Sequence, residues 1–187
     1  MHIGILGGSF NPPHLGHILA AQQVLDYTSI SEVWFLPAYK HTFDKPLAPV
    51  ADRVAMIKLV KFSGTRVSTL EVDYKLSGDT IELVPLFKKL YPNDSFTFII
   101  GSDQLVTFTK WGSWESLLQK LPFLVVPRAG YPPKPLLKGM KLLDSSLFVE
   151  TNISSSMIRE RIKKRLPIDY FVPKKVVNYI TEHNLYL

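Results

Sequence analysis

The chain has 187 residues, a formal net charge of +6 and no cysteine. Hydrophobic residues make up 46% and charged residues 20%, which is ordinary for a globular protein with one sizeable core. The lack of cysteine excludes disulfides, thiolate catalysis and cysteine-ligated zinc. No apolar run approaches the roughly 20 residues of a membrane span, and no signal peptide is recognisable. We therefore expect one cytoplasmic domain, residues 1–187, without a membrane partner.

The N-terminal stretch predicts a strand, a glycine turn and a helix in close succession; it reads MHIGILGGSFNPPHLGHIL. Residues 3–6 form a short apolar run, and apolar residues recur at helical spacing from Ile18 onward. Gly7 and Gly8 permit close approaches that a β-carbon forbids. The helix directs its free N–H groups and the positive end of its dipole toward this turn, which predicts an anion site suited to phosphate.

Two histidines, His14 and His17, lie three residues apart across the predicted start of this helix and therefore share one face beside the anion site. Imidazoles can donate hydrogen bonds to a phosphate near neutral pH, and phosphoryl transfer depends mainly on positioning and charge stabilisation. Surface polar residues are the alternative interpretation, and the protonation state is left open. The glycines do not spell G-x-G-x-x-G, which disfavours a hydride-transferring enzyme.

Further along the chain, apolar runs alternate between the strand and helix patterns. This alternation predicts a doubly wound, Rossmann-like α/β sheet in a single domain, with a C-terminal helical part (residues 152–187) packed on it. Residues 129–146 are rich in proline and lysine, and form either a flap or a plain loop. The expected strands are residues 33–36, 67–72, 96–100, 123–126 and 147–150, and the expected helices are residues 50–62, 80–90, 114–121, 157–165 and 173 to about 184.

Candidate ligand contacts follow several of these strands, at the sheet edge where parallel sheets bind ligands. Gly101 and Asp103 suit ribose binding, although Asp103 could equally be a helix N-cap. Trp111 lies outside the amphipathic run that begins at Trp114, so it is the better candidate for stacking on a ligand. Arg128 ends a strand and could bind a phosphate through two donors.

Two charged segments have alternative interpretations. The loop at residues 38–49 holds Lys40, His41 and Lys45, any of which could reach a polyphosphate or simply be exposed. Ser154 and Ser155 precede a helix with Arg159 one turn further on, which is consistent with either ordinary capping or a second phosphate site. The basic run at residues 159–165, RERIKKR, indicates a solvated helix face or a nucleic-acid contact.

Together these motifs resemble one family over nearly the whole chain. GGSFNPPHLGH and ISSSMIR are similar to the two phosphate motifs of the HxGH nucleotidyltransferase superfamily. IIGSDQLVTFTKWGSWESL, FLVVPRAGY and VPKKVVNYITEHNLY resemble further segments of bacterial nicotinate-nucleotide adenylyltransferases, in that family's order. The match in order is more specific than either phosphate motif alone.

The resemblance implies that the phosphate of nicotinate mononucleotide attacks the α-phosphate of ATP, giving a dinucleotide of the NAD type and pyrophosphate in NAD biosynthesis. Mg²⁺ would be carried by the ATP phosphates. The implied catalytic residues are His14, His17 and Arg159. The implied ATP contacts are Gly7, Gly8, Ser9, Phe10, Lys45, Gly101, Asp103, Ile153, Ser154 and Ser155. The implied mononucleotide contacts are Thr80, Trp111 and Arg128.

Two departures from the family pattern leave alternatives open. The loop YKHTFDK stands where the family has a PPHK-like sequence, which favours Lys45 over Lys40 and His41 as the phosphate contact. The residues Gly78-Asp79-Thr80 replace the family's Ser-Tyr-Thr and place a carboxylate near the expected pyridine site. Nicotinamide mononucleotide is therefore an alternative acceptor, alone or alongside nicotinate mononucleotide.

Other functions are weaker alternatives. Related enzymes transfer a nucleotide to phosphopantetheine or, from CTP, to a polyol phosphate, but the tryptophan segment and Arg128 match the pyridine-nucleotide members best. A non-catalytic nucleotide sensor or an RNA-binding module is the alternative from another class. We expect no nucleic-acid partner, because the basic helix lacks interleaved aromatic residues. The sequence leaves open whether the protein is a homo-oligomer.

Overall fold

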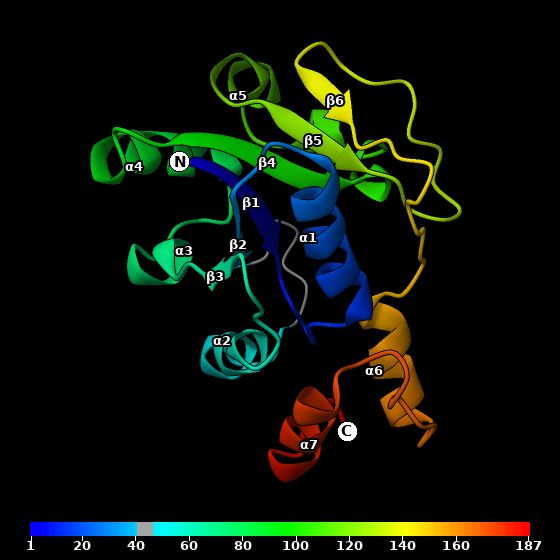
Figure 1. The fold of residues 1–187 in the computed structure, drawn as a ribbon. Helices are drawn as coiled ribbons and strands as arrows, with labels where there is room; N and C mark the ends of the chain where they lie inside the picture. The colour runs from blue at the N-terminus through cyan, green and yellow to red at the C-terminus, as the bar shows by residue number, and fades with distance from the viewer. Residues whose placement is uncertain (41–46) are drawn as a thin grey trace.

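The computed structural model describes residues 1–40 and 47–187. Within these residues six strands form one parallel sheet in the order β3-β2-β1-β4-β5-β6 (Figure 1). The chain starts at a central strand, builds outward to β3 and then returns to β4, so the switch point lies between β1 and β4. The strands are β1 (His2–Gly8), β2 (Glu32–Pro37), β3 (Thr65–Val67), β4 (Ser95–Gly101), β5 (Phe123–Val126) and β6 (Met140–Leu142).

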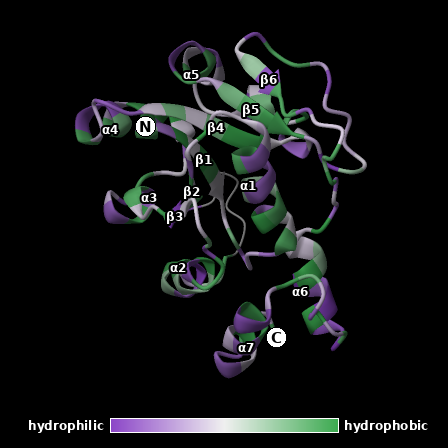
Figure 2. Ribbon diagram, viewed as in Figure 1, coloured by the Kyte–Doolittle hydropathy of each residue, from purple (hydrophilic) through white to green (hydrophobic). Residues whose placement is uncertain are grey.

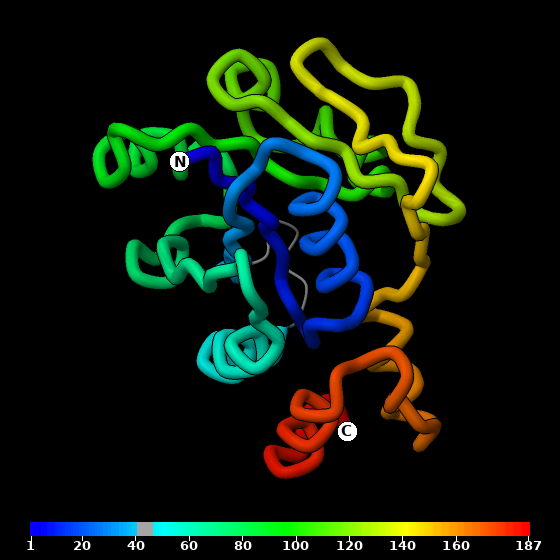
Figure 3. The backbone as a smooth tube through the Cα atoms, in the orientation of Figure 1, coloured from blue at the N-terminus to red at the C-terminus, as the bar shows by residue number. Residues whose placement is uncertain are grey.

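Helices cover both faces of this sheet (Figures 1 and 3). Residues of α1, α2, α6 and α7 share one buried cluster, and residues of α3, α4 and α5 share the other. None of the helices in the described ranges is both long and apolar enough to cross a membrane. The helices are α1 (Leu15–Tyr27), α2 (Val50–Lys58), α3 (Leu70–Asp73), α4 (Leu83–Leu90), α5 (Trp114–Lys120), α6 (Ser155–Lys163) and α7 (Lys174–Glu182).

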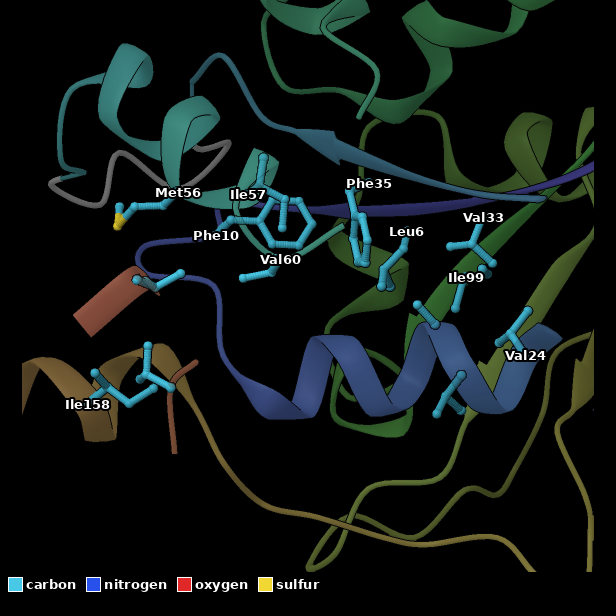
Figure 4. Close-up of a cluster of buried hydrophobic side chains, with 14 of the residues drawn as sticks. Leu6, Phe10, Val24, Val33, Phe35, Met56, Ile57, Val60, Ile99 and Ile158 are labelled. Carbon is cyan, nitrogen blue, oxygen red and sulfur yellow. The ribbon is translucent and has the colours of Figure 1, made fainter. Parts of the chain in front are cut away.

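The central strands are apolar on both faces because each face is covered by helices. Ile5 of β1 lies opposite Trp34 and Phe98, and all three belong to the cluster under α4 and α5. The next residue, Leu6, points into the other cluster, where Val24 of α1 packs (Figure 4). This two-residue alternation between two apolar layers explains why these strands are continuous hydrophobic runs in the sequence. Figure 2 shows the same distribution, with hydrophobic strands inside and hydrophilic stretches on the outer helices.

The C-terminal helices pack beside the turn that follows β1. Ile158 of α6 and Val176 of α7 are fully buried in the same cluster as Phe10. The N–H of Leu15 donates to the carbonyl of Phe171 over 3.0 Å, and the Tyr179 hydroxyl donates to Asp52 of α2 over 2.9 Å. These contacts attach the segment before α7 to the start of α1, and α7 itself to α2.

The predicted strand at residues 147–150 is wrong. The outermost strand is β6 instead, within the segment that had no predicted structure, while residues 147–150 run beside α1 without a strand partner. The backbone N–H and carbonyl of Val149 bond to the side-chain amide of Gln23, at 2.5 and 3.2 Å. One glutamine side chain thus satisfies the backbone groups that a strand neighbour would otherwise pair.

The predicted strand at residues 67–72 is also largely wrong. The strand β3 ends at Val67, and the chain then forms the one-turn helix α3, which buries Leu70 and Glu71. The alternating apolar residues of this segment belong mainly to a helical turn at the edge of the sheet and not to a strand. The other predicted strands and helices are confirmed, with ends that shift by a few residues; α2, for example, ends at Lys58 rather than residue 62.

Candidate active site

A cavity of about 330 Å³ opens at the switch point, beside the carboxyl ends of β1, β4 and β5. This volume lies in the ordinary range for small-molecule sites, roughly 300–1,000 Å³. The chain brings to this cavity residues that lie up to about 150 positions apart in sequence. Of the site residues that the sequence predicts, Gly7, Gly8, Ser9, His14, His17, Thr80, Gly101, Asp103, Trp111, Arg128 and Ile153 line it.

The turn after β1 is shaped by close packing. A β-carbon on Gly7 would lie 2.7 Å from the ring of Phe98, so only glycine fits there. Phe10 adopts a left-handed backbone conformation (φ 47°), which turns its side chain into the core, where it is 1% exposed. Its ring packs edge-on against His17, with centroids 4.8 Å apart. The side chain of Phe10 therefore supports His17 from below and does not line the cavity.

The two predicted histidines meet at the start of α1. Their ring centroids are 3.8 Å apart, and the backbone N–H of His14 donates to Nδ1 of His17 over 3.2 Å. Because Nδ1 accepts this bond, the proton of a neutral His17 is on Nε2, which has no hydrogen-bond partner among the described residues. Nδ1 of His14 is buried and lacks a hydrogen-bond partner in the same part of the chain, which is uncommon for a buried polar atom.

Burial favours the neutral form of both imidazoles. Burial, and to a smaller extent the positive charge of Arg128, lower the pKa of His17 to about 3. Burial also lowers the pKa of His14 well below its usual value, with further contributions from His17 and Arg128. Neutral imidazole still donates one hydrogen bond, so the pair can donate to a bound phosphate without carrying its own charge.

Arg128, Asp103 and Ile153 form one connected group at the ends of β4 and β5. Arg128 pairs with Asp103 over 2.9 Å, and its second amino group donates to the carbonyl of Ile153 over 2.8 Å. Gln104 donates to the same oxygen, Oδ2, of Asp103 over 2.9 Å. Both side chains of the ion pair are mostly shielded, with 25% and 17% exposure. The group joins the end of β4 to the segment that precedes α6. Both bonds to Asp103 are to Oδ2, so its other oxygen, Oδ1, is not used by them.

The predicted second phosphate motif fastens the start of α6 to the turn after β1. The Ser154 hydroxyl accepts the Met157 N–H over 3.2 Å as a helix N-cap. Ser155 donates to the carbonyl of Pro12 over 2.8 Å, and Arg159 donates to the carbonyl of Asn11 over 2.7 Å. The side chains of these three residues are therefore engaged within the protein and lie outside the cavity lining.

Two buried residues that the sequence analysis did not single out organise the other side of the cavity. Arg53, on α2, is 1% exposed and donates to the carbonyls of Ala48, Ser9 and Tyr39, at 3.0, 2.8 and 3.3 Å. Glu71 is 6% exposed, accepts the Tyr39 N–H over 3.3 Å and lines the cavity. The only sequence signal for Arg53 was a charged residue on an apolar helix face, which is too common to identify it.

Glu71→Gln tests the buried carboxyl. Burial raises the pKa of Glu71 to about 7 from an ordinary value near 4.5. Between these values the native carboxyl stays protonated while the unfolded one ionises, so the native state loses stability as pH rises through this window. We expect Glu71→Gln to gain about 1–3 kcal/mol over the wild type between pH 4.5 and 8, measured by urea unfolding.

The control for this prediction is Glu150→Gln, because Glu150 is exposed. The control should show no pH-dependent difference from the wild type. A Glu71→Gln variant whose stability differs from the wild type by the same amount at both pH values would contradict the raised pKa.

Trp111 and Thr80 also line the cavity. The Trp111 ring is held by Phe108 and Phe98, with centroids 5.1 and 6.4 Å away, and is partly exposed to the cavity. Thr80 begins the 3₁₀ turn (Thr80–Glu82) that leads into α4. An aromatic face and a hydroxyl at the start of a helical turn suit a flat, polar ring.

The chain is similar in sequence to known proteins over nearly its whole length. Residues 5–161 match the family described as cytidylyltransferase-like. A nicotinate-nucleotide adenylyltransferase of Bacillus subtilis is 37% identical over 191 residues, covering 98% of this chain and 97% of that protein. A probable nicotinate-nucleotide adenylyltransferase of Shouchella clausii is 40% identical over 188 residues, with 98% and 96% covered. The chain belongs to the nicotinate-nucleotide adenylyltransferase family.

A solved structure shows the same fold. The nicotinic acid mononucleotide adenylyltransferase of Plasmodium falciparum, complexed with NaAD, superposes with a TM-score of 0.81 over 99% of this chain and 97% of that one, at 24% identity. The same enzyme complexed with APC gives a TM-score of 0.83. These matches confirm the Rossmann-like nucleotidyltransferase fold expected for a member of the nicotinate-nucleotide adenylyltransferase family.

Of the contacts that the family resemblance implies, both histidines and the predicted mononucleotide residues line the cavity. Phe10, Ser154, Ser155 and Arg159 stand just behind it and shape the turn that the histidines follow. Lys45 and His41 lie outside the described residues. Lys40 lines the cavity, although the sequence analysis favoured Lys45.

Proposed function

We propose that this protein is a nicotinate-nucleotide adenylyltransferase. A phosphate oxygen of nicotinate mononucleotide attacks the α-phosphorus of ATP, and the bond from that phosphorus to the bridging oxygen breaks as pyrophosphate leaves with the electron pair. The other product is deamido-NAD, and no covalent enzyme intermediate forms. The observation that carries this proposal is the pair of histidines at the start of α1, in one cavity with Arg128 and Trp111, in a chain that matches the family over nearly its full length.

In this mechanism His14 and His17 stabilise the reacting phosphates. The Nε2–H of His17 can donate to a phosphate oxygen, and the positive end of the α1 dipole adds to the same positive field. Because no group in the cavity needs to accept a proton from the attacking phosphate, the contribution of the protein is positioning and charge stabilisation.

We assign the other substrate contacts from where each residue lies in the cavity. Gly7, Gly8, Ser9 and Gly101 lie where backbone can approach ATP, and Asp103 offers its free oxygen, Oδ1, to ribose. Trp111 stacks on the pyridine ring beside Thr80, and Arg128 faces the mononucleotide phosphate while held by Asp103. In this proposal the roles of Phe10, Ile153, Ser154, Ser155 and Arg159 are to shape the ATP side through backbone and packing.

Mg²⁺ enters as part of the ATP substrate. Among residues 1–40 and 47–187, no three histidine, aspartate or glutamate side chains gather as a metal site. The hard oxygen ligands that Mg²⁺ prefers are supplied by the triphosphate and water, with the metal spreading the charge that develops on pyrophosphate. We place this activity in the cytoplasm, with small molecules as the partners and no nucleic acid.

The test is pyrophosphate release from ATP and Mg²⁺ in the presence of single acceptors. We expect release with nicotinate mononucleotide and none with phosphopantetheine. Polyol phosphate supplied with CTP should also give none. Release only with one of these other acceptors would reassign the substrate. Salt-sensitive RNA binding without any ATP turnover would favour a binding module instead.

A further inference from the structure

The end of the cavity beside Trp111 carries a carboxylate. Asp79 lines the cavity together with Trp111 and Gly112. A β-carbon on Gly112 would lie 3.0 Å from both the carboxyl carbon and Oδ2 of Asp79, and 3.1 Å from Oδ1. The carboxylate therefore lies close against the backbone next to the tryptophan, where a β-carbon would push it back by a few tenths of an ångström.

This carboxylate has no charge partner within the described part of the chain. The backbone of Asp79 is bonded, with its N–H donating to the Ser77 hydroxyl over 3.2 Å and its carbonyl accepting the Glu82 N–H over 3.0 Å, but its side chain takes part in no ion pair with any described residue. Of the two cationic side chains among the described residues that line the cavity, Arg128 is already paired with Asp103, and Lys40 forms no ion pair with Asp79. Glu71 lines the same cavity and adds no positive charge. Beside Trp111, the Asp79 carboxylate thus offers hydrogen-bond acceptors and a negative charge.

We propose that Asp79 sets the acceptor preference of the enzyme and makes nicotinamide mononucleotide a substrate alongside nicotinate mononucleotide. This inference rests on the proposed function, which places the pyridine ring against Trp111. The two acceptors differ at one substituent of that ring. The carboxamide is neutral and has two N–H donors that a carboxylate can accept, whereas the nicotinate carboxylate carries a negative charge that Asp79 repels.

The first experiment compares kcat/KM for the two mononucleotides in the wild type and in Asp79→Asn. The variant keeps the size that fits against Gly112 and removes the charge. We expect Asp79→Asn to shift the ratio of kcat/KM by about 10- to 100-fold toward nicotinate mononucleotide. Asp144→Asn is the control, because Asp144 is an exposed carboxylate outside the cavity lining, and its ratio should equal that of the wild type.

A second variant tests the contact between Asp79 and Gly112. Gly112→Ala forces the carboxylate to move by a few tenths of an ångström. We expect this change to alter the acceptor ratio when Asp79 is present and to alter it less in the Asp79→Asn background, since the two effects share one contact. Equal effects in both backgrounds would show that Gly112 acts independently of the carboxylate.

The outcomes separate this inference from the proposed function. Turnover of both mononucleotides by the wild type, with a ratio that shifts in Asp79→Asn, supports the proposal. Turnover of nicotinate mononucleotide alone by the wild type, or a ratio that is the same in Asp79→Asn, overturns the proposal and leaves the proposed function intact. A lack of pyrophosphate release with either mononucleotide overturns both.

Discussion

His17→Asn lowers kcat about 100- to 1,000-fold while the protein folds as the wild type does. The asparagine oxygen can take the place of Nδ1 and accept the His14 N–H, so the local backbone bond survives. The substitution removes Nε2–H, the donor proposed to stabilise charge on the transferred phosphate. The measurement is steady-state pyrophosphate release, with the unfolding midpoint of each variant recorded in parallel.

Two further substitutions sharpen this prediction. His17→Gln places an amide near the position of Nε2 and should recover part of the lost turnover. His183→Ala, at the end of α7, removes a histidine that stacks on Tyr179 outside the cavity and should leave kcat unchanged. Turnover by His17→Asn within about threefold of the wild type would remove His17 from the mechanism.

Arg53→Met lowers the free energy of unfolding by about 3 kcal/mol or more, because it leaves three half-buried carbonyl groups without the donor that the buried guanidinium supplies. These carbonyls belong to Ser9, Tyr39 and Ala48, so the same guanidinium joins the turn after β1 to both ends of the segment between β2 and α2. Urea unfolding measures the loss. At temperatures where the variant is still folded, we also expect a raised KM for ATP, since Ser9 lines the cavity.

Arg66→Met is the matched control for this substitution. Arg66 is exposed on β3 and lies over the ring of Trp34 at 4.7 Å, so its loss should cost less than about 1 kcal/mol. Arg53→Lys keeps the charge but not the fork of donors and should fall between the two methionine variants. Similar unfolding midpoints for Arg53→Met and Arg66→Met would contradict the role given to the buried guanidinium.

Much of the fold could be predicted because the central strands are buried on both sides. The strands β1, β2, β4 and β5 are continuous apolar runs, which have few other stable arrangements in a chain that alternates with amphipathic helices. The edges of the sheet were harder to predict. At residues 147–150 a single side chain, Gln23, satisfies the backbone, and no local pattern reveals that contact across more than a hundred residues.

The residues of the site also differ in how far the sequence could predict them. His14, His17 and the glycines belong to one short motif, so their grouping follows from local sequence. Arg128, Asp103 and Trp111 could be placed at one edge because each follows a buried strand or its turn. Arg53 and Glu71 depend on how α2 and α3 pack around residues 39 and 48, which only the tertiary structure shows. Hydroxyls such as Ser154 were predicted near phosphate, but capping and tethering of α6 already use them.

The most direct test of the adenylyl transfer follows the α-phosphate itself. ATP labelled at that phosphate is incubated with Mg²⁺, nicotinate mononucleotide and the purified protein, and the products are separated. The mechanism predicts that the label appears in deamido-NAD, in an amount equal to the pyrophosphate released. Label recovered in AMP, or left in ATP, would contradict it, because the mononucleotide would then not be the group that receives the adenylyl moiety.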